Sequence, residues 1–219
     1  MLTLKTPLEK GSKKLINAWA FYDWANSVYS LVISSAIFPI YFGALFSEIN
    51  TISFLSYDIK NTAVISFVTA SAFLIVSFIS PILSGIADYI GNKKKFMKFF
   101  VYLGSVSCIG LYWFELETIY LGLLFYFLAL IGLWSSIVFY NSYLPDIAFP
   151  EQQDRVSARG YSYGYIGSVT LLLFNLVMVM QPELFGIEGS KSEASMTAMK
   201  YSFISVGIWW ALFSQYSFY

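Results

Sequence analysis

Histidine is absent from this chain of 219 residues, and Cys108 is its only cysteine. A lone cysteine excludes an internal disulfide, and the missing histidine excludes the His/Cys clusters that commonly hold metal ions. The sequence also contains neither a Gly-rich loop that cradles phosphates nor a nucleophile motif. We therefore expect no metal, no cofactor and no enzymatic activity, and we find no support for transport driven by ATP.

Charge is scarce as well, because only 12% of the residues are charged, against about a quarter in an ordinary soluble domain. The 13 basic and 13 acidic residues cancel, so no net charge points to nucleic acid as a partner. Hydrophobic residues make up 58% of the chain and aromatic residues 20%. This balance argues against a soluble enzyme and favours a membrane protein.

The apolar residues are concentrated in six stretches, each close in length to the ~20 helical residues that cross a hydrocarbon core. Backbone polar groups in lipid must be bonded within the chain, so each stretch is expected to be a helix. The sequence therefore predicts an all-α membrane protein, with a single six-helix domain over residues 1–219 in contact with the lipid bilayer. The expected spans are approximately residues 25–46, 63–82, 96–113, 118–140, 163–180 and 201–218.

The basic residues are unevenly distributed between the two sides of these spans. Ten of the 13 lie in the N-terminal segment and in the connections after the second and fourth spans. Because cytoplasmic loops carry an excess of lysine and arginine, both termini are expected in the cytoplasm, and a bacterial inner (cell) membrane is the expected location. The last span, which ends at residue 219, has no basic cap. We expect either that something else stabilises it or that the chain is a fragment.

A charged motif follows the second span, where residues 84–95 read SGIADYIGNKKK. Gly91 would allow the positive φ of a tight turn between two helices, and the small residues Ser84 and Gly85 would let another helix approach closely. Asp88 could meet a helix N-terminus or an arginine and so stabilise one conformer. The alternative is a solvated loop whose lysines only set the topology.

This motif resembles the signature loop between the second and third helices of the major facilitator superfamily, with Asp88, Gly91, Lys93 and Lys94 on the pattern. Ser84 stands where glycine is usual, and Tyr89 replaces a basic residue. Residues 17–27, 141–148 and 155–168 are similar to one branch of that superfamily, the autophagy-related vacuolar amino-acid effluxers and their bacterial relatives. The likeness extends over residues 17–210 and covers the N-terminal half of a family that normally has twelve spans.

The resemblance implies a secondary transporter that moves small solutes, amino acids among them, by alternating access. It also implies a second six-helix half as partner, which would be the missing C-terminal half of the same protein or another copy of the chain. The chain alone is then not expected to transport. A six-helix scaffold or assembly subunit that transports nothing, and a truncated gene product, are the alternatives.

Helix 1 carries polar residues on one face, because Asp23, Asn26, Ser30 and Ser34 follow each other at steps of three and four. A polar stripe within a membrane span should face protein or water. Asp23 would lie roughly 15 Å from the centre of the span at 1.5 Å per residue, which favours a gate or anchor over a proton carrier at the midplane. The neighbouring aromatic residues Trp19, Tyr22 and Trp24 are expected in an interfacial aromatic belt.

Two sets of candidate residues follow from the stripe and the motifs. Helices 1 and 4 resemble those that line the central path of the fold, and the fifth span has one isolated amide in its apolar part. The candidates along the path are Asn26, Ser30, Ser34, Trp134, Ser135, Ser136, Asn141 and Asn175. The candidates for gating or conformational roles are Asp23, Ser84, Gly85, Asp88, Gly91, Lys93, Lys94, Asp146, Arg155 and Arg159.

Three further expectations concern the fourth and fifth spans. Asp146 and Arg155 or Arg159 are opposite charges within one loop, where ion pairs with each other or with Asp23 or Asp88 are expected. The fourth span carries no charged residue, which leaves proton coupling through this half unsupported. The fifth span is expected to pack tightly through a face of small residues, formed by Gly160, Gly164 and Gly167.

Overall fold

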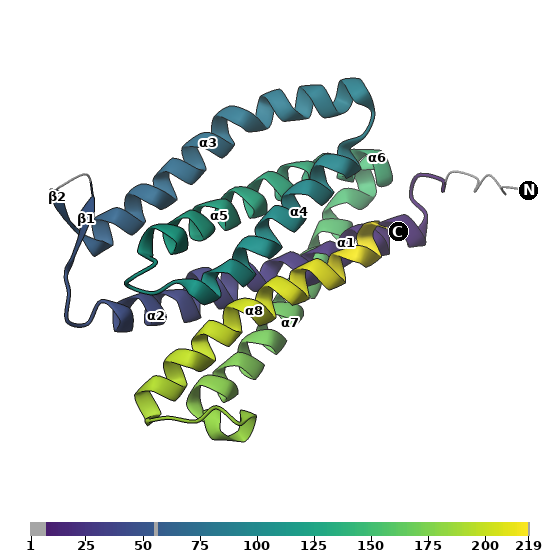
Figure 1. Ribbon diagram of the computed structural model, residues 1–219. Coiled ribbons are helices and arrows are strands. Elements are labelled where there is room, and N and C mark those ends of the chain that lie inside the picture. Colours follow the sequence, from purple (N-terminus) through teal and green to yellow (C-terminus); the bar gives the residue numbers. More distant parts are fainter. Residues whose placement is uncertain (1–7, 55–56, 219) are drawn as a thin grey trace, which may run out of the picture.

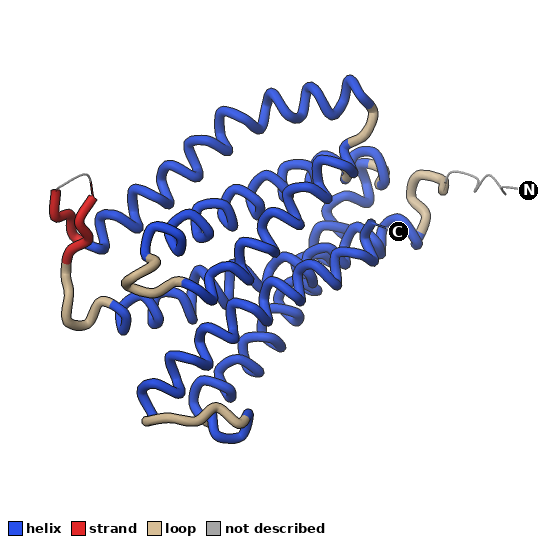
Figure 2. Tube along the Cα trace, viewed as in Figure 1, coloured by secondary structure: helices blue, strands red, loops and turns tan. Residues whose placement is uncertain are grey.

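The protein is a bundle of long helices with one short hairpin, as the computed structural model shows for residues 8–54 and 57–218 (Figures 1 and 2). The first long helix is built from three consecutive segments, α1 (Lys13–Val28), the π-helical η1 (Tyr29–Ile37) and α2 (Phe38–Leu45). We refer to these three together as helix 1. The other long helices are α3 (Asn61–Ile90), α4 (Lys93–Gly110), α5 (Ile119–Ser142), α7 (Pro150–Met180) and α8 (Lys191–Phe218).

Five helical segments in the described residues are long and apolar enough to cross a membrane, and they are Lys13–Leu45, Asn61–Ala87, Lys93–Trp113, Ile119–Ile147 and Pro150–Met180. The prediction of an all-α membrane protein is therefore confirmed at this level. The predicted sixth span also forms a helix, α8, but α8 is not among the five. Lys191, Glu193 and Lys200 lie in its first three turns, and serines recur through the rest.

The helices extend beyond the predicted apolar spans, mainly at the end of the bundle where α1 begins. Helix 1 begins at residue 13 rather than 25, because Ser12 caps it by accepting a hydrogen bond from the Leu15 amide. α3 continues to residue 90 and stops where Gly91 adopts φ 68°, as predicted for this turn. Hydrophobicity locates the part of a helix in lipid, whereas caps and turns decide where the helix ends.

The bundle has two distinct ends (Figure 1). The start of α1, the end of α8, the α3–α4 turn and the short α6 (Leu144–Ile147) lie at one end. The other end carries the antiparallel hairpin of β1 (Thr51–Phe54) and β2 (Tyr57–Lys60), the turn η2 (Leu111–Trp113) before α5, and the turn η3 (Pro182–Phe185) before α8. The hairpin was not foreseen, since its two strands of four residues are too short for a clear alternating pattern.

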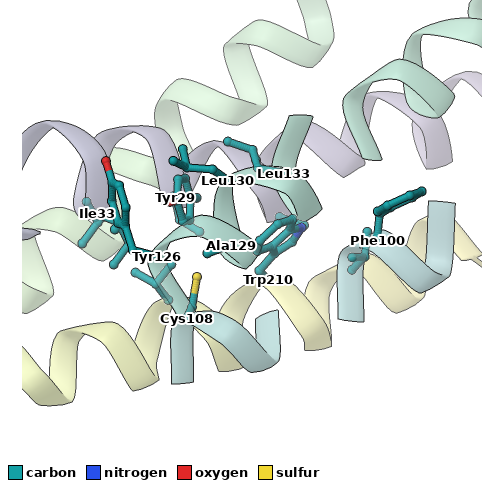
Figure 3. Packing of buried hydrophobic residues seen from close by; sticks show 14 of the residues in the cluster. Tyr29, Ile33, Phe100, Cys108, Tyr126, Ala129, Leu130, Leu133 and Trp210 are labelled. Atoms are coloured by element: carbon teal, nitrogen blue, oxygen red, sulfur yellow. The ribbon is translucent and has the colours of Figure 1, made fainter. Parts of the chain in front are cut away.

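The core forms where helix 1, α4, α5 and α8 meet. Figure 3 shows Trp210 of α8, Cys108 of α4 and Ala129 of α5 gathered beside Tyr29, and all four residues are fully buried. A Cβ atom on Gly132 of α5 would lie 2.5 Å from the backbone of α4, so these two helices touch through their main chains. Close packing through small residues is the main way in which helices associate in lipid.

α3 stands apart from this core on one side of the bundle (Figure 1). Only 11% of the residues in its most apolar stretch are buried, against 50% in the corresponding stretches of α4 and α5. Its long apolar side chains, among them Phe67, Leu74 and Phe78, are exposed. One broad face of α3 is therefore available to lipid or to another helix.

Candidate functional site

The middle of helix 1 is π-helical over nine residues, Tyr29–Ile37. The amide of Phe38, at the end of this segment, donates to the Ile33 carbonyl five residues earlier. π-helical turns are rare and occur frequently at functional sites, since they widen the helix and shift the side chains that follow. The apolar pattern of this span does not distinguish a π-helix from an α-helix, so the segment was not predicted.

The π-helical segment turns three hydroxyl groups outward, those of Ser30, Ser34 and Ser35, while Val32 and Ile33 between them are buried. We name these three residues the serine face. The Ser35 hydroxyl donates to the Ser30 carbonyl at 2.8 Å, so part of this face is bonded to its own helix. The face nevertheless places polar groups on the surface of the bundle in the middle of a membrane-spanning helix.

Two cavities lie beside the serine face. One, of about 280 Å³, lies between helix 1 and α7 and is lined by Ser30, Ser35 and Tyr165 among others. The other, of about 630 Å³, lies between helix 1 and α3, and Ser34 and Thr69 are among the residues that line it. Small-molecule sites commonly occupy about 300–1,000 Å³, so the larger cavity has a suitable size for a small solute.

Asp23 lies on α1, about one helical turn before Ser27, which lines the smaller cavity. At this point α1 meets α5 and α7. Its carboxylate accepts a hydrogen bond of 2.9 Å from the Tyr140 hydroxyl. On the α7 side it packs against Gly160, where a Cβ atom would come within 2.5 Å of a carboxylate oxygen. The predicted small-residue face of the fifth span is confirmed in this contact, since Cβ atoms on Gly164 and Gly167 would lie 2.5 Å from Ser27 and 2.8 Å from Trp24.

Aromatic side chains pack around Asp23 in the interior. The Trp19 ring stacks on Tyr140 with centroids 4.2 Å apart, and the Trp19 indole N–H donates to the Tyr140 carbonyl at 2.8 Å. Tyr22 is fully buried and its hydroxyl donates to Ser136 at 2.8 Å. The prediction of an interfacial belt is therefore wrong for Trp19 and Tyr22, because both rings fill space between helices.

The charged loop residues at this end of the bundle pair differently from the expected pattern. Asp146 accepts from the Lys93 ammonium at 3.1 Å, and the Arg159 guanidinium donates to the Asn17 side chain at 2.8 Å. Asp146 is more than half exposed, so this ion pair stabilises the structure by about 1 kcal/mol at most. The ion pair of Asp146 therefore joins the start of α4 to α6, and its partner is Lys93 rather than the expected Arg155 or Arg159.

The remaining gate candidates lie near this ion pair. Ser84 is half-buried and Gly85 is exposed, both on α3. Lys94 and Arg155 are exposed. Asp88 falls within α3, but its side chain lies outside the described part of the structure, so its predicted docking stays a prediction.

The candidates along the path divide into two groups. Ser30, Ser34, Trp134 and Asn141 lie on the surface of the bundle. The buried group is more than nine-tenths inaccessible and comprises Asn26, Ser135, Ser136 and Asn175. Asn175, for example, accepts from the Ser205 hydroxyl of α8 at 2.9 Å and therefore joins two helices of the bundle.

Sequence reasoning missed the second wall of the larger cavity. Thr62, Ser66 and Thr69 of α3 all line it, together with Tyr126 of α5. The signal was present, since the three α3 hydroxyls follow one another at steps of four and three residues and must share a helix face. This spacing alone does not indicate a site, because hydroxyl side chains that bond their own helix are common in membrane spans.

Comparisons with known proteins identify the family of the chain. A family described as "Vacuole effluxer Atg22 like" matches residues 11–219. The chain is 36% identical over 198 residues to the uncharacterized MFS-type transporter YxiO of Bacillus subtilis (strain 168), which covers 90% of this chain and 44% of that protein. It is 32% identical over 176 residues to an uncharacterized protein of Aquifex aeolicus (strain VF5), covering 78% of this chain and 41% of that protein. No solved structure matches the chain.

The chain thus spans less than half the length of the curated relatives it matches. Its match to the family model nevertheless covers nearly every residue, and five helices in the described residues are long and apolar enough to cross a membrane. The chain is an integral, multi-pass membrane protein and belongs to the Atg22-like vacuole effluxer family, a branch of the MFS-type transporters.

Proposed function

We propose that the chain forms one six-helix bundle of a secondary transporter, which moves small solutes between this bundle and a second one. In this proposal α8 is the sixth span, and the end of the bundle that carries both α1 and the end of α8 faces the cytoplasm. The basic residues at the start of α4 and at the start of α7 support this orientation in a bacterial cell membrane.

The serine face is the observation that carries the proposal. Hydroxyl and carbonyl groups in contact with hydrocarbon lack the partners that water or protein would supply. The two cavities beside the serine face supply room for water and solute at the middle of the span. A face of this kind is expected along a solute path and is unexpected on a surface that only contacts lipid.

A second bundle would cover this path. α3 offers an exposed apolar face next to the larger cavity, and helices of another bundle could pack on it while leaving the cavity open to one side. The curated relatives are more than twice as long as the segment matched, which supports a second bundle of comparable size. That bundle would belong to the same protein, to a separate chain or to a second copy.

The solutes we propose are small amino acids without net charge. The described lining of the larger cavity carries no basic residue that would pair with an acidic side chain and no carboxylate that would pair with a basic one. The volume of about 630 Å³ accommodates a molecule of this size.

Transport in liposomes tests this function. The chain is produced alone and together with the C-terminal remainder of the Bacillus subtilis relative, and assembly is verified by co-purification and light scattering. Exchange of radiolabelled neutral amino acids is then measured. We expect exchange only with the assembled pair, because the path of the lone chain has one open side.

A matched pair of variants locates the path. Ser34→Phe fills the larger cavity and should abolish exchange, whereas Ile208→Phe on the exposed face of α8 should leave it unchanged. An assembled pair that exchanges no amino acid, or a lone chain that exchanges as fast as the pair, would contradict the proposal.

A further inference from the structure

The carbonyl of Ser34 has no amide to bond within its helix. In an α-helix its donor would be the amide of Phe38, but that amide donates to Ile33 instead. In a π-helix its donor would be the amide of residue 39, which is Pro39 and has no N–H. The change from π to α geometry and the proline together remove the two amide donors that a helix would offer this oxygen, which we call the unpaired carbonyl.

Ser34, which carries the unpaired carbonyl, lines the larger cavity. Helical carbonyls point toward the C-terminal end of their helix, so the Ser34 oxygen projects toward Pro39, and both residues line this cavity between helix 1 and α3. An unsatisfied carbonyl in the middle of a membrane span is costly unless a ligand or water bonds to it.

The hydroxyl groups of α3, on the wall of the cavity across from Ser34, also offer oxygen lone pairs to a ligand. Thr69 donates its only hydroxyl hydrogen to the Ile65 carbonyl at 2.8 Å, which leaves its oxygen as an acceptor. The Thr69 oxygen lies 3.4 Å from the Tyr126 hydroxyl, so the two form one polar patch on the far wall. Ser66 likewise donates to the Thr62 carbonyl at 2.8 Å.

We propose that this cavity binds a small monovalent cationic group between the Ser34 carbonyl and the Thr69 hydroxyl. The group is either the primary ammonium of the transported solute or a sodium ion, since both seek oxygen acceptors and helix-break carbonyls are known to coordinate such ions in transporters. The described lining contains no carboxylate, so a divalent cation would lack its usual ligands.

This inference deepens the proposed function, because it rests on solute or ions reaching the cavity. Binding is measured separately from transport, by isothermal titration calorimetry on the chain in lipid nanodiscs. The titrants are sodium chloride and methylammonium chloride, each against choline chloride at constant ionic strength. Saturable heat with methylammonium alone identifies the solute ammonium, saturable heat with sodium identifies an ion site, and no saturable heat with either overturns the inference.

Pro39→Ala is the decisive variant. It restores an amide N–H at residue 39, which removes the unpaired carbonyl whether that part of the helix stays π-helical or becomes α-helical. We expect at least a tenfold loss of affinity. Pro81→Ala, the same change inside α3, is the matched control and should leave the affinity unchanged. Equal affinity in Pro39→Ala and the unmodified chain would overturn the inference.

A second pair of variants keeps the test valid if Pro39→Ala fails to fold, which circular dichroism would reveal. Thr69→Val removes one acceptor and should weaken binding several-fold. Thr170→Val is its control, because Thr170 is exposed on α7 and makes the same bond to its own helix, to the Ile166 carbonyl at 2.7 Å. Unchanged affinity in Thr69→Val would overturn the inference.

The two proposals fail in different ways. Cation binding that Pro39→Ala abolishes, in a protein that exchanges no solute with any second bundle, would preserve the site and refute the transport function. Amino-acid exchange that continues unchanged in Pro39→Ala would preserve the function and refute the site.

Discussion

At the scale of single residues, Asp23 is held by partners from two other helices rather than by a positive charge. Its carboxylate accepts from Tyr140 and packs on Gly160, and the Tyr140 ring in turn stacks on Trp19. These contacts fasten α1 to α5 and α7 near the end of the bundle that we propose is cytoplasmic. A carboxylate with such contacts is suited to anchor helix 1 while the path beside it opens or closes.

Tyr140→Phe tests this anchor. The substitution removes the hydroxyl that donates to Asp23 and leaves a largely buried acceptor with one bond fewer, which should destabilise the protein by about 1–3 kcal/mol. The measurement is thermal or denaturant unfolding in detergent. Tyr102→Phe is the matched control, because the Tyr102 hydroxyl also bonds a side chain, Gln215, but both residues are exposed.

The energetic coupling between Asp23 and Tyr140 is a more specific test of the anchor than the single substitution. If Asp23→Asn is introduced first, Tyr140→Phe should cost measurably less than in the unmodified chain, since the charged acceptor is already gone. An equal loss of stability for Tyr140→Phe in the two backgrounds would show that the Asp23–Tyr140 bond does not stabilise the bundle. A loss for Tyr102→Phe as large as that for Tyr140→Phe would show the same.

Spacing alone predicted that Ser30 and Ser34 share one face of helix 1, and the structure has both exposed. It did not predict the unpaired Ser34 carbonyl, because a sequence does not reveal which register of backbone bonds the helix adopts before Pro39. The partners of Asp146 could not be predicted either. Lys93 is distant from it in sequence, and only the fold brings the two together.

At the scale of elements, the long helices were predictable in order because apolar length decides them, and five of the six predicted spans are long and apolar enough to cross a membrane. The ends of the helices were not predictable from apolar length. Ser12 caps the start of α1 and the Gly91 turn ends α3, and both residues lie outside the apolar stretches. The hairpin of β1 and β2 escaped prediction, as eight residues carry too little pattern. Contacts between helices were predictable only where glycines cluster, as in α7.

Gly132→Ala tests the contact between α4 and α5. A Cβ atom there would lie 2.5 Å from the backbone of Gly104, which cannot move aside as a flexible side chain could. We expect a loss of about 1–3 kcal/mol of stability, the usual cost of overpacking, measured as a lower Tm in detergent.

Gly43→Ala is the control for this substitution. Gly43 lies in α2 with open space around its Cβ position, so alanine should leave stability unchanged or raise it by up to about 1 kcal/mol. A Tm for Gly132→Ala equal to that of Gly43→Ala would contradict the close approach of α4 and α5.

At the scale of the whole molecule, the bundle has two kinds of surface in the membrane. The outer faces of α4 and α8 present apolar side chains such as Val106 and Ile208, as lipid requires. The side that carries the serine face presents hydroxyl groups and two cavities. The central claim is that this second side lines a water-filled path, with a second bundle opposite.

Thiol accessibility measures this claim most directly. Ser34, Val106 and Ile208 are replaced one at a time by cysteine in a Cys108→Ala background, and membranes containing each protein are treated with a water-soluble, charged methanethiosulfonate. Such reagents need a thiolate, which forms only in contact with water. We predict that the cysteine at position 34 reacts at least tenfold faster than those at 106 and 208. Equal, slow reaction at all three positions would contradict the account, because the serine face would then be in contact with lipid.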